Sequence, residues 1–213
     1  TANVAAAGTY GTAFSHVITA NRTPLSFTAT GLPVGLSVNT ATGVISGTPR
    51  EAGVFAVSLG ALNLSGQGGG ALLLRIEKAP LTVTVADASR AFGQANPVFA
   101  VNYQGLANGD TAAVLTTAPV VTTNAGPRSP AGSYGLQAAG AVSANYAFTY
   151  VDGSLTVTRV AVTIALGNLS QSFTGDALKP DLQTSVADVG LNFTYNGGST
   201  RPVLPGVYTV VAT

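Results

Sequence analysis

The sequence predicts an all-β protein built from tandem β-sandwich domains, and three observations carry this prediction. Charged residues make up 8% of the chain, against about 25% in ordinary domains, so the long charged side chains that cover amphipathic helices are scarce. Short apolar segments with alternating polarity are bounded by turn residues, among them 26 glycines and 11 prolines. Two sequence elements also recur three times in the same order, which indicates repeated domains.

The first recurring element is an aromatic residue followed closely by glycine. It occurs as Tyr10-Gly11, Phe92-Gly93 and Phe173-Thr174-Gly175, and the aromatic residues are 82 and then 81 positions apart.

The second recurring element is a glycine turn that leads into a strand with an aromatic residue. Its glycines are Gly53, Gly132 and Gly206, which are 79 and 74 positions apart. Glycine adopts positive φ readily and therefore suits the turn. The residues after it alternate, so we expect Tyr134 and Leu136 to point toward the core from one face of a strand.

These repeats divide the chain into three small domains, residues 1–78, 79–159 and 160–213. Short alternating runs then predict the strands of each domain. In the first domain they are Ala13–Thr19, Leu25–Thr30, Gly53–Leu59 and Ala71–Ile76. In the second they are Leu81–Ala86, Val98–Tyr103, Val114–Val121, Ser133–Gln137, Tyr146–Tyr150 and Leu155–Thr158, and in the third Val162–Leu166, Leu191–Tyr195 and Val207–Ala212. Asp152-Gly153 lies between two alternating runs and predicts a β-hairpin.

The connections between the domains are short and contain no Gly/Ser-rich hinge. We therefore expect an elongated array of fairly stiff character, with small contacts between neighbouring domains. The third domain continues for only 7 residues after Gly206, whereas the second continues for 25 from Gly132 to Val157. This difference predicts a truncated third domain with an open sheet edge, through which the protein could self-associate.

Composition excludes several classes of function. The net charge is +1, and the nine Lys and Arg residues are scattered singly, so no basic surface for nucleic acid is expected. Cysteine is absent, which excludes disulfides and thiol chemistry and fits a bacterial exported protein. Methionine is also absent, even at position 1, so we expect the chain to be a fragment without its own signal peptide. Its longest apolar run, Ala71–Leu74, is too short to span a bilayer.

Candidate catalytic and metal-binding residues are few, and we expect no enzyme, no cofactor and no metal site. His16 is the single histidine, and we interpret it as an exposed strand residue because zinc sites and catalytic triads need partners that the sequence does not cluster around it. Gly66–Ala71 resembles a dinucleotide-binding fingerprint, but a strand-like run follows it, so a flexible hairpin loop is expected. Asn108-Gly109-Asp110 is interpreted as a turn with Asp110 as a local cap.

Lysines and tyrosines could serve two further kinds of chemistry. An isopeptide cross-link needs a buried lysine beside an acid, whereas Lys78 stands at a domain junction and Lys179 before a proline, so both are expected to be exposed. Glycan-binding surfaces use flat aromatic rings, but tryptophan is absent. Tyr134, Tyr146 and Tyr208 fit core positions, which leaves Tyr103 and Tyr195 as the less committed tyrosines.

Residues 27–57 resemble the putative-Ig repeat of bacterial surface proteins and the cadherin-like domains of dystroglycan type. The segments that carry this resemblance are Phe27–Val38, Thr42–Pro49 and Ala52–Phe55. Residues 80–158 resemble the MBG ("mostly bacterial Ig-like") domain of YGX type, and residues 161–213 resemble a second, truncated MBG domain. The matching residues of the former are Leu81–Val83, Phe92-Gly93, Tyr103–Leu106, Ala131–Gly135 and Gly153–Val157.

The resemblance implies immunoglobulin-like or cadherin-like sandwiches in large, repetitive, secreted or cell-surface bacterial proteins, often adhesins, and it brings no catalytic residues. We therefore expect a non-catalytic spacer segment. Two alternatives stay open: an adhesion module that binds a glycan or a host protein through loops at a sandwich end, and an accessory region of a secreted enzyme.

Overall fold

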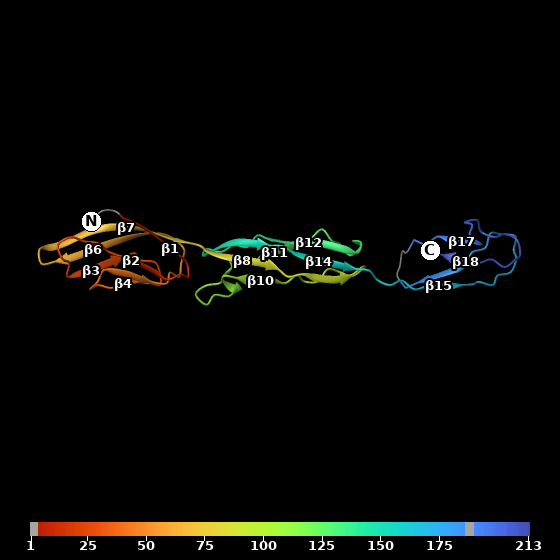
Figure 1. The fold of residues 1–213 in the computed structure, drawn as a ribbon, viewed down its shortest axis with the longest axis horizontal. Helices are drawn as coiled ribbons and strands as arrows, with labels where there is room; N and C mark the ends of the chain where they lie inside the picture. Colours follow the sequence, from red (N-terminus) through yellow and green to blue (C-terminus); the bar gives the residue numbers. More distant parts are fainter. Residues whose placement is uncertain (1–3, 186–189) are drawn as a thin grey trace. The chain divides into compact units, whose positions relative to one another are not determined.

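The computed structural model describes residues 4–185 and 190–213 and divides the chain into two compact units, Thr1–Thr158 (unit 1) and Arg159–Thr213 (unit 2). Within the described residues the regular elements are β-strands and one 3₁₀ turn at Ala112–Val114, which confirms the predicted all-β class (Figure 1).

Unit 1 begins with a seven-stranded sandwich. One sheet has the order β1-β7-β6-β3 and the other the order β2-β5-β4. The strands are β1 (Val4–Thr9), β2 (Phe14–Val17), β3 (Ser26–Thr30), β4 (Leu36–Val38), β5 (Val44–Gly47), β6 (Gly53–Asn63) and β7 (Gly66–Glu77). All pairs are antiparallel except β1 with β7, which is parallel.

A second seven-stranded sandwich completes unit 1. Its sheets have the orders β10-β8-β13 and β11-β12-β14-β9. The strands are β8 (Ala79–Val85), β9 (Ala88–Ala91), β10 (Val101–Gln104), β11 (Val120–Thr122), β12 (Gly132–Ala139), β13 (Tyr146–Val151) and β14 (Gly153–Thr158). The β8–β13 and β14–β9 pairs are parallel.

The alternation read from the sequence decides which face of each strand is buried. In β7 the side chains of Leu72, Leu74 and Ile76 are buried, whereas Leu73 and Arg75, which alternate with them, are exposed. Successive strand residues point to opposite faces, so one face supplies the core. Burial of each large aliphatic side chain contributes about 1.5–3 kcal/mol.

The apolar core continues from the first sandwich into the second. Only Lys78 separates β7 from β8, and one buried cluster contains Ile76 and Tyr10 from the first sandwich together with Leu81 and Tyr146 from the second. The expectation of small contacts is therefore wrong inside unit 1. A second cluster, around Val83, Leu136 and Val157, fills the remainder of the second sandwich.

The repeat predicted from the sequence is visible in backbone geometry. Gly11, Gly93 and Gly175 have φ of +71°, +84° and +82°, a left-handed conformation that favours glycine. Tyr10 N donates to Glu77 O at 2.9 Å and Gly11 N to Pro49 O at 3.0 Å. Their counterparts in the second sandwich make equivalent bonds: Phe92 N donates to Thr158 O at 2.9 Å and Gly93 N to Pro127 O at 3.0 Å.

The predicted hairpin at Asp152-Gly153 is wrong. Strand β13 before it pairs with β8, and β14 after it pairs with β12 and β9, so the chain crosses from one sheet to the other. A hairpin turn of type I′ needs positive φ at both central residues, and neither residue has it. Glycine at position 153 instead allows the backbone to pass close to Val85, because a Cβ there would lie 2.6 Å from Val85 O.

Two further expectations on loops and strands are corrected. Gly66–Gly70 lie in β7, paired with β6 up to Asn63, and the turn is only Leu64-Ser65. The backbone of these residues pairs with β6, and backbone pairing does not require side chains. The segment expected from its composition to be a loop is therefore a strand. The strand expected at Val114–Val121 is reduced to β11, because Pro119 immediately before it lacks an N–H for pairing.

Unit 2 consists of two small sheets. Strands β15 (Ile164–Gly167) and β16 (Asp181–Thr184) form one antiparallel pair, and β17 (Phe193–Tyr195) and β18 (Val210–Ala212) form the other. Two-stranded sheets are marginally stable in isolation, so unit 2 depends on packing between them. Tyr195 is its buried aromatic residue among those described.

Candidate functional site: a tyrosine–aspartate junction in unit 1

The two sandwiches of unit 1 meet at a carboxylate that accepts two tyrosine hydroxyl groups. Tyr10, directly after β1, donates to Asp110 Oδ2 at 2.8 Å, and Tyr146, at the start of β13, donates to the same oxygen at 2.6 Å. The two rings pack edge to face, with centroids 5.4 Å apart and an interplanar angle of 76°. Hydrogen bonds to a charged acceptor are the stronger ones, so this cluster joins the sandwiches firmly.

A tight turn presents Asp110 to the tyrosines. Asn108 and Gly109 have φ of +54° and +77°, and Asp110 N donates to Ala107 O at 2.8 Å. Two successive positive φ values define a type I′ turn, for which Asn-Gly is the preferred pair. The turn also directs Ala107 N to the Tyr146 hydroxyl at 2.8 Å.

The environment of Tyr146 changes its acid–base behaviour. Burial raises its pKa above the usual value, and the hydrogen bond to Asp110 raises it further because ionisation would place two negative charges together. Tyr146 therefore stays a neutral donor over the physiological pH range.

Substitution of Tyr146 by Phe should lower the free energy of unfolding of unit 1 by about 1–3 kcal/mol, because Asp110 loses a donor and Ala107 N loses its acceptor. The folded-state pKa of Tyr146 is raised, so its contribution is complete below the unfolded pKa of about 10 and declines as the pH rises above it. Denaturant titrations from pH 8 upward should show a decline of up to about 1.4 kcal/mol per pH unit that the variant lacks. Equal slopes for both proteins would contradict this assignment.

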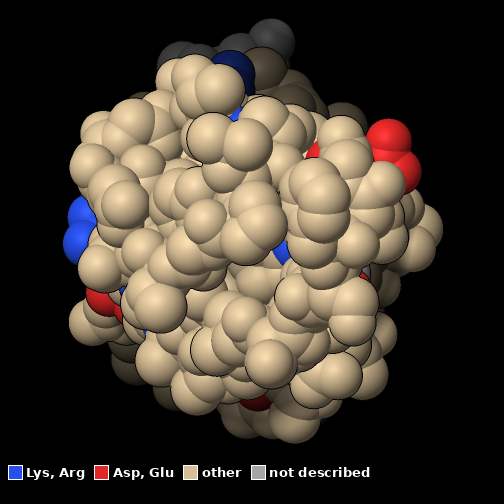
Figure 2. Space-filling model, turned by 90° about the vertical axis from the view of Figure 1, so that its right-hand side faces the viewer, with Lys and Arg blue, Asp and Glu red and all other residues tan. Residues whose placement is uncertain are grey.

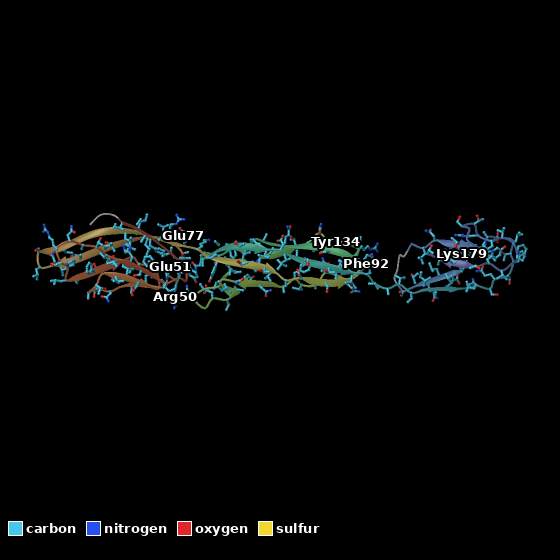
Figure 3. All side chains as sticks on the ribbon, viewed as in Figure 1. Arg50, Glu51, Glu77, Phe92, Tyr134 and Lys179 are labelled. Carbon is cyan, nitrogen blue, oxygen red and sulfur yellow. The ribbon has the colours of Figure 1, made fainter. Side chains whose placement is uncertain are left out.

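Further contacts surround the cluster. Ala52 N donates to Asn145 Oδ1 at 3.0 Å, Lys78 Nζ to Ser143 O at 2.7 Å and Asn108 Nδ2 to Pro49 O at 3.2 Å. Gly11 lies so close to Ala107 that a Cβ on it would be 2.2 Å from the alanine Cβ. Figure 3 shows Arg50, Glu51 and Glu77 around the same end of the first sandwich.

The structure places the residues singled out from the sequence as follows. His16 lies on β2 opposite Ile45 and is half-buried, not exposed as expected. Lys78 and Lys179 are exposed, as expected. Tyr195 is buried, so its interpretation as an uncommitted tyrosine is wrong, whereas Tyr103 is half-buried and packs against both clusters of unit 1.

Asp110 is the functional residue that sequence reasoning missed. Its turn was predicted correctly, but its carboxylate binds residues 100 and 36 positions away and is not a local cap. Within residues 4–185 and 190–213, no group of three or more histidine, aspartate and glutamate side chains could hold a metal ion. Asp188 lies outside these ranges.

A tyrosine that bonds to the backbone four residues earlier recurs in the two later repeats. Tyr134 donates to Pro130 O at 2.8 Å, and Tyr208 donates to Leu204 O at 3.1 Å. Figure 3 shows Tyr134 and Phe92 in the second sandwich. The bond resembles the tyrosine corner of immunoglobulin domains, which fixes a turn where a strand enters its sheet.

Tyr134→Phe should destabilise unit 1 by about 1 kcal/mol, the typical contribution of one hydrogen bond. Thermal unfolding followed by circular dichroism measures the change. Tyr103→Phe is the control, because the described structure gives its hydroxyl no hydrogen bond. Equal losses in both variants would show that the corner bond has no special role.

A buried cation lies in the second sandwich. Arg90 on β9 is 7% exposed, and its guanidinium donates to Asn96 Oδ1 at 2.7 Å, to Ala91 O at 3.2 Å and to Gly126 O. Asn96 Nδ2 in turn donates to Ala125 O at 2.7 Å. Arg90 thus holds the segment at Ala125–Gly126 against β9.

The architecture defines the class of protein. Two seven-stranded sandwiches, each made of a four-stranded and a three-stranded sheet, have the layer arrangement of immunoglobulin-like domains. The sequence model of the family "Putative Ig domain" matches residues 1–104. The model of the "MBG domain (YGX type)" matches residues 81–156, and that of a further "MBG domain" family matches residues 162–213. Along the chain, the match to the Putative Ig domain is therefore followed by matches to two MBG domain families, in the order that the sequence predicts.

Several solved structures are similar over part of their length. Four N-terminal Ig domains of Dscam1 isoform 6.9 are 14% identical, with 74% of this chain and 44% of that chain covered and a TM-score of 0.38. The endo-fucoidan hydrolase MfFcnA9 of glycoside hydrolase family 107 is 21% identical, with 73% and 32% covered and a TM-score of 0.31. A putative alpha-galactosidase/melibiase from Bacteroides fragilis is 28% identical, with 39% and 19% covered and a TM-score of 0.33. The chain spans less than half the length of each, and no curated protein sequence matches it.

Proposed function

We propose that this chain is a non-catalytic spacer segment of a large secreted or cell-surface bacterial protein, of adhesin-like character. Ig-like and MBG domains are typical of bacterial surface proteins. The observation that carries the proposal is the junction in unit 1, where an apolar core and the Tyr10–Asp110–Tyr146 cluster join two sandwiches. A spacer needs this rigidity to hold other domains at a fixed distance.

The surface is consistent with a role of this kind. On the face drawn in Figure 2, few charged side chains are visible, and those of one sign do not gather into a patch. Arg75 and Glu77 form an ion pair with both side chains exposed, which contributes little. No described helix has the length and apolar character to cross a membrane.

Backbone ¹⁵N relaxation of the full chain tests the proposed rigidity. The amides of both sandwiches in unit 1 should report one rotational diffusion tensor. In Asp110→Ala, the diffusion tensors fitted to the two sandwiches should begin to diverge, because one of the contacts that join them is lost. Two tensors already present in the unaltered protein would refute a rigid spacer. Antibody labelling of intact cells of the source bacterium tests surface exposure separately.

A further inference from the structure

Unit 2 contains a cavity of about 400 Å³, which is within the size range of pockets that hold small ligands. Three aromatic residues line it, Phe173, Tyr195 and Tyr208, together with polar side chains such as Asn168, Gln171 and Lys179. The junction described above lies in unit 1, so this cavity is a separate feature. Its lining combines apolar rings with hydrogen-bonding groups.

Hydrogen bonds fix the described walls. Gln171 Nε2 donates to Asn168 O at 2.7 Å and to Lys179 O at 2.8 Å, which ties two parts of one wall together. Leu178 N donates to Pro202 O at 3.3 Å and so connects this wall with the opposite segment. These bonds hold the backbone of the cavity walls in place, which limits the entropy lost on binding.

Phe173 departs from its counterparts in the other two repeats. Tyr10 is 4% exposed and Phe92 is half-buried, whereas Phe173 is 62% exposed and lines the cavity. In the third repeat the recurring aromatic ring is thus available to a ligand.

Tyr195 supplies a second, independent observation. It is 6% exposed and lines the cavity, and its hydroxyl is buried without a hydrogen-bond partner among the described residues. A buried polar group in this state is destabilising unless a ligand or a water molecule satisfies it. The hydroxyl is closed to solvent, so a ligand would reach it after a shift of the tyrosine ring.

We propose that this cavity binds a neutral saccharide unit. A sugar ring presents an apolar C–H face, which stacks on an aromatic side chain, and hydroxyl groups that pair with amide, carboxylate and ammonium groups. Asp176 and Lys179 offset each other in charge, and Lys179 is the single cation among the described lining residues, so an anionic ligand would lack convergent partners. A fully apolar peptide would leave the polar lining groups without water or partners.

Titration of the ¹⁵N-labelled full chain with neutral monosaccharides and disaccharides, to tens of millimolar, tests this site. Saturable shifts are expected at residues 168–180 and 202–210. Phe173→Ala should weaken binding at least tenfold with little effect on folding, since the side chain is largely exposed. Tyr195→Phe should weaken binding about fivefold, the equivalent of one hydrogen bond, while the melting temperature of unit 2 stays the same or rises. Leu64→Ala, which alters an exposed residue of unit 1, should change neither quantity.

Three results would overturn the proposal. One is the absence of saturable shifts with every saccharide of the panel. Another is an unchanged affinity in Phe173→Ala. The third is a shift pattern at residues 168–210 that depends on protein concentration and not on saccharide, because a second copy of the chain would then fill the site. Each would leave the proposed spacer role of unit 1 intact, since the relaxation experiment tests that role at different residues.

Discussion

Replacement of Gly11 by Ala should lower the free energy of unfolding of unit 1 by about 2–5 kcal/mol. Two independent costs add at this position. Gly11 has a φ of +71°, and a non-glycine residue in the left-handed region costs about 1–2 kcal/mol. The new Cβ would also lie 2.2 Å from Ala107 Cβ in the second sandwich, and overpacking of this kind costs about 1–3 kcal/mol. Chemical denaturation measures the sum.

The repeat offers a matched control in the same chain. Gly93 has nearly the same backbone conformation, with a φ of +84°, but nothing lies within 4 Å of a Cβ built on it. Gly93→Ala should therefore show only the backbone cost of about 1–2 kcal/mol. The difference between the two variants isolates the contact with Ala107, and relaxation data should show loosened sandwiches only in Gly11→Ala. Equal losses of stability would mean that the close approach at Ala107 is relieved without cost.

Local features of the sequence were sufficient to predict the strands in which apolar and polar residues alternate strongly. Ser133–Gln137 lies inside β12 and Leu155–Thr158 inside β14, because Tyr, Leu and Val at every second position have one buried face to fill. The left-handed glycines beside Tyr10 and Phe92 follow from the repeat for a similar reason. Only glycine takes that backbone conformation at low cost, so its position is visible without knowledge of neighbours.

Features that depend on distant partners were missed. Strand β1, with the sequence VAAAGT, carries weak β-propensity, and its place comes from parallel pairing with β7 about 68 residues later. Asp152-Gly153 has the composition of a hairpin turn, yet the same residues connect two different sheets, and only the register of β8, β12 and β13 decides between these outcomes. Asp110 shows the same limit: the turn that contains it is local, but the tyrosines that it binds are not.

Arg90→Ala should lower the free energy of unfolding of the second sandwich by about 2–4 kcal/mol. The guanidinium donates to three acceptors in a buried environment, and each hydrogen bond with a charged partner contributes about 1.5–3 kcal/mol before desolvation is subtracted. Alanine would leave the Gly126 carbonyl and Asn96 Oδ1 without this donor and would open a cavity beside β9. Denaturant unfolding of the full chain measures the loss.

The geometry of the arginine fork adds a second test of the same assignment. Arg90→Lys keeps the charge, but an ammonium on a flexible stem cannot reproduce the planar donors that reach Asn96, Ala91 and Gly126 together, so most of the loss should remain. Arg75→Ala is the control, because that side chain is 64% exposed and its ion-pair partner among the described residues is Glu77 at the surface, so the change should cost less than about 1 kcal/mol. A stability of Arg90→Lys close to that of the unaltered chain would show that Arg90 acts through its charge alone. Hydrogen exchange at the amides of Ala125 and Gly126 should become faster in Arg90→Ala, and unchanged exchange would mean that other contacts position this segment.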